Sequence, residues 1–261
     1  MRWTIWDRHV AVHRRERVMR HMLQKNLALV TSRLTKGETF KHVQVADKIT
    51  EVICMSPKTS NNGFLFPLYL YNENGQKSEN LSANFRAFID ARCEHHYTPE
   101  EILGHIYAVL HAPIYREKYA EFLRIDFPRV PFPEDSADFE TLSALGWDLM
   151  QKHLLRDIPG LGLGKYRGKG DNAVAKPRYS EAEQAIYVNE AQKFAPVPLE
   201  VWNFHIGGYQ VLAKYLKDRK GRTLTLDEIN NVENVANVLA FTIEQMGKID
   251  EAYRAAFPDN V

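Results

Sequence analysis

Residues 63–111, GFLFPLYLYNENGQKSENLSANFRAFIDARCEHHYTPEEILGHIYAVLH, contain the change from strand-like to helical sequence that decides the fold. Aromatic and apolar residues dominate its start, and an Asn-Gly pair at 74–75 is a turn signal. Farther on, Thr98 can cap a helix, Pro99 suits the first helical position, and Glu101 completes a capping box. The stretch therefore predicts a β-rich part followed by a helical part.

The residues before this stretch extend the β-rich part. A basic, partly apolar run predicts a helix over about 14–24. Three short runs of β-branched and aromatic residues then predict strands, in NLALVTSR (26–33), FKHVQVAD (40–47) and TEVICMS (50–56).

The residues after it predict more helices and then mixed structure. Helical spacing continues over 115–124 and 137–155. A long final helix is expected from Leu226 to about 255, with Thr225 and Glu228 forming another capping box. This order predicts an α+β fold in one domain, 1–261. Its expected sub-parts are a β-rich 1–75, a helical 76–157, and a mixed 158–261 with a basic loop, strands and helices.

Composition excludes several classes of protein. The chain has 261 residues, 44% hydrophobic and 26% charged, so it is long enough for a real core. Because its formal net charge is only +1, any surface that binds nucleic acid must be a local basic patch. Two cysteines are too few for a disulfide framework, and no run is long and apolar enough for a membrane span. A reduced, cytoplasmic setting is expected.

The run HIGGYQVLAKYLKDRKGR (205–222) concentrates charge in this nearly neutral chain. Its apolar residues recur at helical spacing and predict a short amphipathic helix, which Gly207 and Gly208 would let the chain enter tightly. The cations of this helix either form a solvated face or contact an anion such as a nucleic-acid backbone. These cations are Lys214, Lys217, Arg219, Lys220 and Arg222.

Three other segments offer contacts to a nucleic acid. The basic N-terminus supplies Arg8, Arg14 and Arg15, and the glycine-rich loop GLGLGKYRGKG (160–170) supplies Lys165, Arg167 and Lys169. That loop fails the phosphate-loop and dinucleotide patterns, because Pro159, Tyr166 and Arg167 stand where those motifs need other residues. In SPKTSNNG (56–63), a lysine could meet a phosphate and the polar residues could read bases, although a purely structural turn has the same composition. The candidates there are Lys58, Thr59, Ser60, Asn61 and Asn62.

No catalytic or metal motif is recognisable. Adjacent residues as in CEHH (93–96) rarely bind one ion together, and no second cluster accompanies them, so no metal site is expected. An enzyme with an unrecognised site stays open as an alternative, with Asp126, His105 and His111 as the residues to test.

Three separated stretches resemble one family: NLALVTSRLTKGETFKHVQVADKITEVICMSPKTSNNGFLFPLYLY, IYAVLHAPIYREKYAEFLRIDFPRVPFP and VWNFHIGGYQVLAKYLKDRKGRTLTLDEI. They resemble the C-terminal specificity (target-recognition) domain of LlaBIII-like Type ISP restriction–modification enzymes, from about residue 7 to residue 253. The family's N-terminal segment usually reads more like Arg-Pro-Phe-Asp than the WTIWD here, and only Trp6 and Asp7 keep part of it.

The resemblance implies a DNA-recognition module of a larger enzyme that contains nuclease, translocase (helicase) and adenine methyltransferase domains. Its expected partners are double-stranded DNA and those domains. The resemblance also implies no catalytic activity and no cofactor for this chain, because the ATP and S-adenosylmethionine sites lie in the other domains. The alternative is a protein-interaction module whose helical part docks on the methyltransferase domain and which binds DNA weakly.

Overall fold

The computed structural model describes residues 16–258 except 59–60 and 93–94. Its first part contains a short helix α1 (Glu16–Met19), a 3-10 turn η1 (Arg20–Leu23) and a three-stranded antiparallel sheet in the order β2-β1-β3. The hairpin of β4 and β5 follows this sheet, and its turn contains the predicted Asn-Gly pair. The strands are β1 (Ala28–Ser32), β2 (Val43–Ala46), β3 (Gly63–Pro67), β4 (Tyr69–Tyr71) and β5 (Lys77–Glu79).

The strand predicted over 50–56 is wrong. These residues form a turn, in which the Glu51 carboxylate accepts a hydrogen bond from the Ile53 N–H at 2.8 Å. The Cys54 N–H closes the turn by donating to the Glu51 carbonyl at 3.3 Å, and the turn meets the start of β3 where the Gly63 N–H donates to the Val52 carbonyl at 2.8 Å. Val52 and Ile53 are exposed, at 39% and 43%.

The second part is helical, as predicted. Thr98 and Glu101 form the predicted capping box, with both reciprocal hydrogen bonds present. The longest helices of this part, α3 and α6, cross where Gly104 meets Gly146, so their backbones come close. The helices are α2 (Ala83–Asp90), α3 (Pro99–His111), α4 (Pro113–Lys118), α5 (Ala120–Leu123) and α6 (Ser136–His153).

The third part combines a four-stranded antiparallel sheet in the order β6-β9-β8-β7 with a two-stranded hairpin and three helices. The glycines at 207 and 208 form the turn of this hairpin, and its second strand leads directly into the basic helix α8. The elements are β6 (Lys165–Arg167), β7 (Arg178–Ser180), β8 (Ala185–Tyr187), β9 (Lys193–Ala195), α7 (Leu199–Trp202), β10 (His205–Ile206), β11 (Tyr209–Gln210), α8 (Val211–Lys217) and α9 (Leu226–Ala256).

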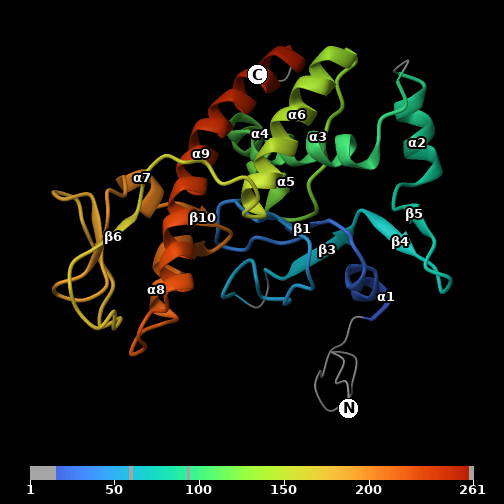
Figure 1. Cartoon of the computed structure of the whole chain (residues 1–261). Helices are drawn as coiled ribbons and strands as arrows, with labels where there is room; N and C mark the ends of the chain where they lie inside the picture. The colour runs from blue at the N-terminus through green and yellow to red at the C-terminus, as the bar shows by residue number, and fades with distance from the viewer. Residues whose placement is uncertain (1–15, 59–60, 93–94, 259–261) are drawn as a thin grey trace.

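The final helix α9 joins the second and third parts. Its N-terminal half, including Ile229 and Val232, packs in a core with β8, β9 and α8. Its C-terminal half, including Ile249 and Tyr253, packs in another core with α3, α4 and α6 (Figure 1). The structure confirms the α+β class and the long final helix. The division at 75 and 157 stays a prediction, and the β4–β5 hairpin spans the first of these boundaries.

A chain of polar side chains crosses the helical core. The Tyr107 hydroxyl lies 2.6 Å from His153 Nδ1, and His153 Nε2 lies 2.9 Å from the Thr242 hydroxyl, which donates to the Val238 carbonyl at 2.7 Å. Because Thr242 donates onward, it accepts from His153, which must then accept from Tyr107. This order requires a neutral imidazole, and burial together with the nearby Arg116 guanidinium lowers the pKa of His153 to about 4.

We expect this network to make folding sensitive to acid. Among the described residues, the groups that face His153 are Tyr107, His111, Arg116 and Thr242, none of which is a carboxylate that could stabilise an imidazolium. A folded-state pKa below the unfolded value near 6.5 means that the stability contribution is complete above pH 6.5 and is lost as the pH falls toward 4. That loss is about 3 kcal/mol for His153.

Urea unfolding between pH 7 and pH 4 measures this effect. In the variant His153→Gln, an amide can accept from Tyr107 and donate to Thr242 without titrating. The variant should therefore show a smaller fall in unfolding free energy with acid than the parent chain. Equal slopes for the two proteins would contradict the assignment.

Candidate nucleic-acid interface

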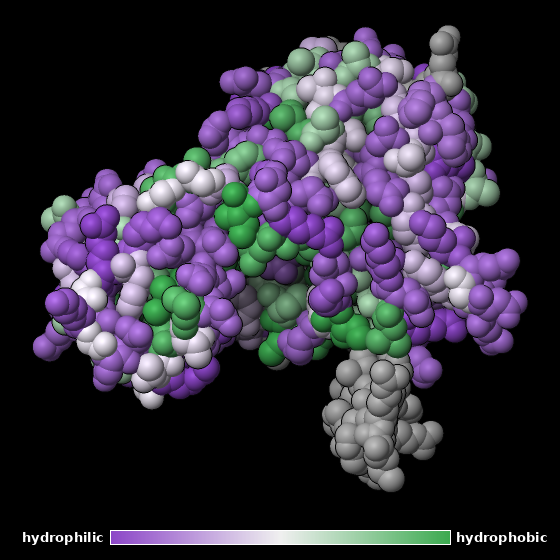
Figure 2. Space-filling view, viewed as in Figure 1, coloured by the Kyte–Doolittle hydropathy of each residue, from purple (hydrophilic) through white to green (hydrophobic). Residues whose placement is uncertain are grey.

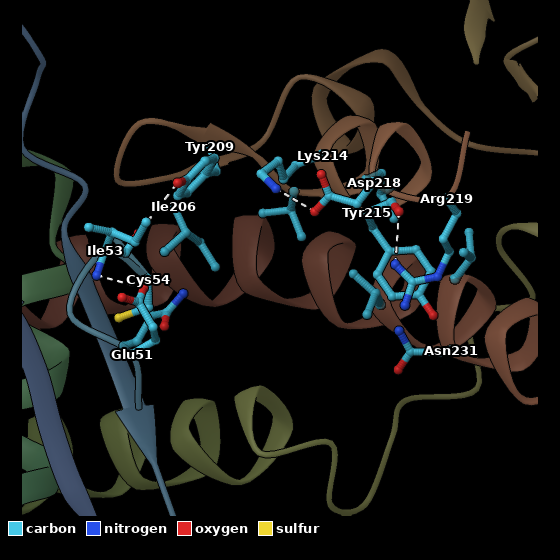
Figure 3. A pocket seen from close by; sticks show the side chains of 15 residues that line it. Glu51, Ile53, Cys54, Ile206, Tyr209, Lys214, Tyr215, Asp218, Arg219 and Asn231 are labelled. Atoms are coloured by element: carbon cyan, nitrogen blue, oxygen red, sulfur yellow. Dashed lines mark hydrogen bonds and ion pairs between the residues drawn. The ribbon is translucent and has the colours of Figure 1, made fainter. Parts of the chain in front are cut away.

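A groove of about 450 Å³ separates the first and third parts of the chain. Figure 2 shows it as a hollow with an apolar floor between two polar masses. The turn around Ile53 forms one wall, α8 forms the other, and α9 contributes Val232 and Val235. Tyr209 on the hairpin reaches toward the Ile53 carbonyl, at 3.4 Å (Figure 3). The predicted basic segment therefore lies along a groove and not on an isolated outer face.

Three of the five cations in that segment are bound to acids of the same chain. Lys214 pairs with Asp218 one helical turn away. Arg219 and Arg222 both contact Glu228, at 2.9 Å and 3.0 Å. The Thr225 backbone N–H and these two guanidinium groups hold the pKa of the Glu228 carboxyl below its usual range. Glu228 therefore fixes the end of the basic segment to the start of α9.

The remaining two cations, Lys217 and Lys220, are exposed and form no ion pair within the described part of the chain. They are the cations of the segment best placed to meet an anion in solution. Arg219 is partly covered and lies 3.5 Å from the centroid of the Tyr215 ring, which further fixes its position.

The polar loop around residues 56–62 is built on Glu38, whose side chain is only 14% exposed. One carboxylate oxygen accepts from His42 Nε2 at 2.9 Å and from the Asn61 amide at 2.7 Å. The other accepts from the Ser56 hydroxyl at 3.0 Å and lies 3.7 Å from the Lys58 ammonium group. Hydrogen bonds from these groups hold the pKa of Glu38 below its usual range despite partial burial.

The residues of this loop that were predicted to contact bases lie in different environments. Asn61 is fully buried, and its side-chain oxygen also accepts from the Lys36 N–H at 3.1 Å, which argues against direct base contact. Asn62 is partly exposed and makes no side-chain hydrogen bond within the described residues. Lys58 is about half exposed, while Thr59 and Ser60 lie outside the described residues, as do Arg8, Arg14 and Arg15.

The Gly-Gly turn packs directly on this loop. Gly207 has φ +55°, donates to the Lys41 carbonyl at 2.7 Å, and leaves no room for a Cβ, which would lie 1.8 Å from the Met55 carbonyl oxygen. Gly208 donates to that same oxygen at 3.0 Å. The two glycines are therefore needed for the close approach of the β10–β11 hairpin to the first part of the chain. Sequence reasoning missed this role, because the contact is long-range.

The predicted loop cations lie on or beside the four-stranded sheet. Lys165 in β6 pairs with Glu233 of α9 at 2.8 Å. Arg167 and Lys169 are exposed, and Arg167 Nε donates to the Ala195 carbonyl at 3.4 Å. A basic loop leading into strands was expected here, and most of 158–177 lies outside the named strands, with the short strand β6 between Gly164 and Gly168.

The residues of the enzyme alternative do not form an open site. His105 and His111 are buried in the helical part, and burial lowers the pKa of His105 to about 4. Asp126 is exposed and pairs with Arg33 at 3.0 Å. Among the described residues, no group of three or more His, Cys, Asp or Glu side chains could hold a metal ion. Likewise, none of the described helices is long and apolar enough to cross a membrane.

Solved structures share this fold. The chain is similar to DrdV in a cryo-electron microscopy DrdV–DNA complex (TM-score 0.66, 22% identity, covering 87% of this chain and 24% of that one). It is similar to a nuclease-deletion mutant of the Type ISP restriction-modification enzyme LlaGI in complex with a DNA substrate mimic (0.59, 17%, 89% and 21%). It is also similar to the ATP-dependent Type ISP enzyme LlaBIII bound to DNA (0.64, 16%, 88% and 16%).

At these identities the structural similarity establishes the fold alone. The chain spans between about a sixth and a quarter of the length of these proteins. No curated protein sequence matches it. The family model of the Type ISP C-terminal specificity domain matches residues 1–248, which is nearly the whole chain. The chain therefore belongs to the Type ISP C-terminal specificity domain family.

Proposed function

We propose that this chain recognises a specific sequence in double-stranded DNA for a Type ISP restriction–modification enzyme and catalyses no reaction itself. The observation that carries the proposal is the family match over residues 1–248. The DNA complexes of the three similar structures support it, as does the groove with Lys217 and Lys220 beside it. Methyl transfer, ATP hydrolysis and DNA cleavage would then belong to the nuclease, translocase and methyltransferase domains of the enzyme.

Binding of the chain to a pool of randomised duplexes tests this proposal. A recognition domain should enrich one short sequence over several rounds, and its affinity for that sequence should fall with salt. Enrichment of no sequence, by a chain that melts cooperatively, would refute sequence recognition. Turnover of DNA with S-adenosylmethionine or ATP by the purified chain would refute the second clause of the proposal.

A second candidate function is docking on the methyltransferase domain. Two apolar side chains of the helical part, Phe122 and Ile125, are 69% and 66% exposed, which favours a protein partner near α5. This function predicts weak DNA binding without sequence enrichment, so the same selection separates it from DNA recognition.

The exposed lysines of the basic segment give the first test of the interface. The variant Lys217→Glu with Lys220→Glu should weaken binding to every duplex about equally. It should also lower the slope of log K against log salt by about two units, since each lost phosphate contact removes roughly 0.9. Fluorescence anisotropy between 50 and 300 mM salt measures both quantities.

A control with the same change of net charge is available on α4 and the C-terminal half of α9, in Lys118→Glu with Lys248→Glu. Its slope should equal that of the parent chain. If both variants lose the same slope, the effect comes from overall charge, and α8 does not meet DNA.

A further inference from the structure

The four-stranded sheet carries a row of three cationic side chains and one tyrosine that crosses all of its strands. Arg167 of β6 pairs directly with Lys193 of β9, Lys193 with Tyr187 of β8, and Tyr187 with Arg178 of β7. Directly paired residues of antiparallel strands point to the same face. The next row along, at Tyr166, Phe194, Ile186 and Tyr179, packs into the core on the opposite face. The four residues Arg167, Lys193, Tyr187 and Arg178, here called the cationic row, therefore lie on the outer face.

The cationic row places like charges side by side. Arg167 and Lys193 are like charges directly opposite each other on neighbouring strands, an arrangement that destabilises a sheet. One acid, Glu183, contacts the row, where it pairs with Lys193 and accepts from the Tyr187 hydroxyl at 2.6 Å. Arg167 and Arg178 are exposed and have no ion pair within the described part of the chain. A ligand with several negative charges would relieve this repulsion.

The geometry of the row selects among anionic ligands. It spans three interstrand spacings, about 14 Å, which corresponds to about four axial rises of about 3.4 Å along one DNA strand and so to roughly five successive phosphates. Arg178 lies 4.0 Å and Lys193 5.0 Å from the centroid of the Tyr187 ring. The ring is therefore already engaged by cations, and it is not free to stack on an unpaired base as single-strand binding requires.

We propose that the outer face of the four-stranded sheet is a second DNA contact, which binds the phosphates of duplex DNA without reading its sequence. This inference rests on the proposed function. The Tyr187 ring pre-orients Arg178, so less side-chain entropy is lost when its guanidinium group meets a phosphate. The face would fix the register and orientation of the duplex, while base contacts come from elsewhere.

Neutralising the two unpaired arginines tests this inference. The variant Arg167→Gln with Arg178→Gln should lower the salt slope of duplex binding by about two units, for the selected sequence and for unrelated sequences alike. The sequence that it enriches from a randomised pool should be the same as that of the parent chain. A melting curve verifies that the sheet is intact, and removal of the like-charge pair should leave its melting temperature equal or higher.

A matched control replaces two exposed arginines of the helical part that form no ion pair within the described residues, in Arg92→Gln with Arg129→Gln. Arg92 also stacks on an aromatic ring, 4.3 Å from the centroid of Phe88. An unchanged slope for R167Q/R178Q, or an equal loss in the control, would overturn the inference. A changed enriched sequence would also overturn it, because the face would then read bases. If the parent chain itself binds no duplex, the proposed function is refuted. If the parent chain binds duplexes but R167Q/R178Q keeps its salt slope, only the inference about the sheet is refuted.

Discussion

Replacing Gly146 with alanine should lower the free energy of unfolding by about 3 kcal/mol, although alanine is the better helix former. A Cβ at Gly146 would lie 1.9 Å from the Gly104 carbonyl oxygen and 2.8 Å from the Ala108 nitrogen, both on α3. These are backbone atoms in the middle of a helix, so they cannot move aside as the end of a side chain could. Helices α3 and α6 would have to separate, which would open the core around Leu142 and Leu149.

The long final helix provides the control, because Gly247 in α9 has nothing within 4 Å of its Cβ position. Gly247→Ala should raise the unfolding free energy by about 0.5–1 kcal/mol through helix propensity alone. Urea denaturation of both variants gives opposite signs for the same chemical change. If Gly146→Ala also stabilised the chain, the close crossing of α3 and α6 would be disproved.

This crossing marks the limit of what the sequence predicts about the fold. The starts of α3 and α9 were predicted at the correct residue, because capping boxes at Thr98 and Thr225 are local signals. The role of Gly104 and Gly146 could not be predicted, since it depends on which helices meet. The segment at 50–56 has strand-like composition, yet it folds into a turn closed by the hydrogen bond from the Cys54 N–H to the Glu51 carbonyl. Whether such a segment becomes a strand depends on pairing with a distant strand, which its composition does not specify.

The candidate site shows the same limit. The cationic run at 214–222 is visible in the sequence, whereas the acid that binds two of its arginines, Glu228, follows the run and was assigned only to a helix cap. The cationic row of the sheet was missed in part, because Lys193 and Arg178 join one row with Arg167 only through the strand order β6-β9-β8-β7. Strand register is long-range information that a single sequence does not contain.

The composition of the loop at 56–62 fits a structural turn and a base-contacting loop equally well. The sequence alone therefore does not decide between these two roles. Figure 3 shows the neighbouring turn at Glu51 to Cys54 on the wall of the groove, opposite Lys214. Within the loop, Asn61 is buried against Glu38, while Asn62 is partly exposed and directly follows it. Of these two adjacent asparagines, one is buried and the other is partly exposed. Separate substitutions can therefore distinguish a structural role of the loop from base contact.

Asn61→Ala removes a donor from a mostly buried carboxylate and an acceptor from the Lys36 N–H, so we expect it to lower the unfolding free energy by about 2 kcal/mol. Asn62→Ala should leave the melting temperature unchanged. If Asn62 reads a base, its loss should relax the preference at one base pair by roughly 1–3 kcal/mol, while affinity for unrelated duplexes stays constant.

Selection from randomised duplexes beside a melting curve, for each variant, separates these effects. Asn74→Ala in the exposed β4–β5 turn makes the same chemical change away from the groove, and it should alter neither quantity. If Asn62→Ala enriches the parent sequence unchanged, the loop is scaffold at both asparagines. Base contacts would then have to come from residues farther along the chain, first among them Lys169 beside the four-stranded sheet, because its exposed side chain has no ion pair within the described residues.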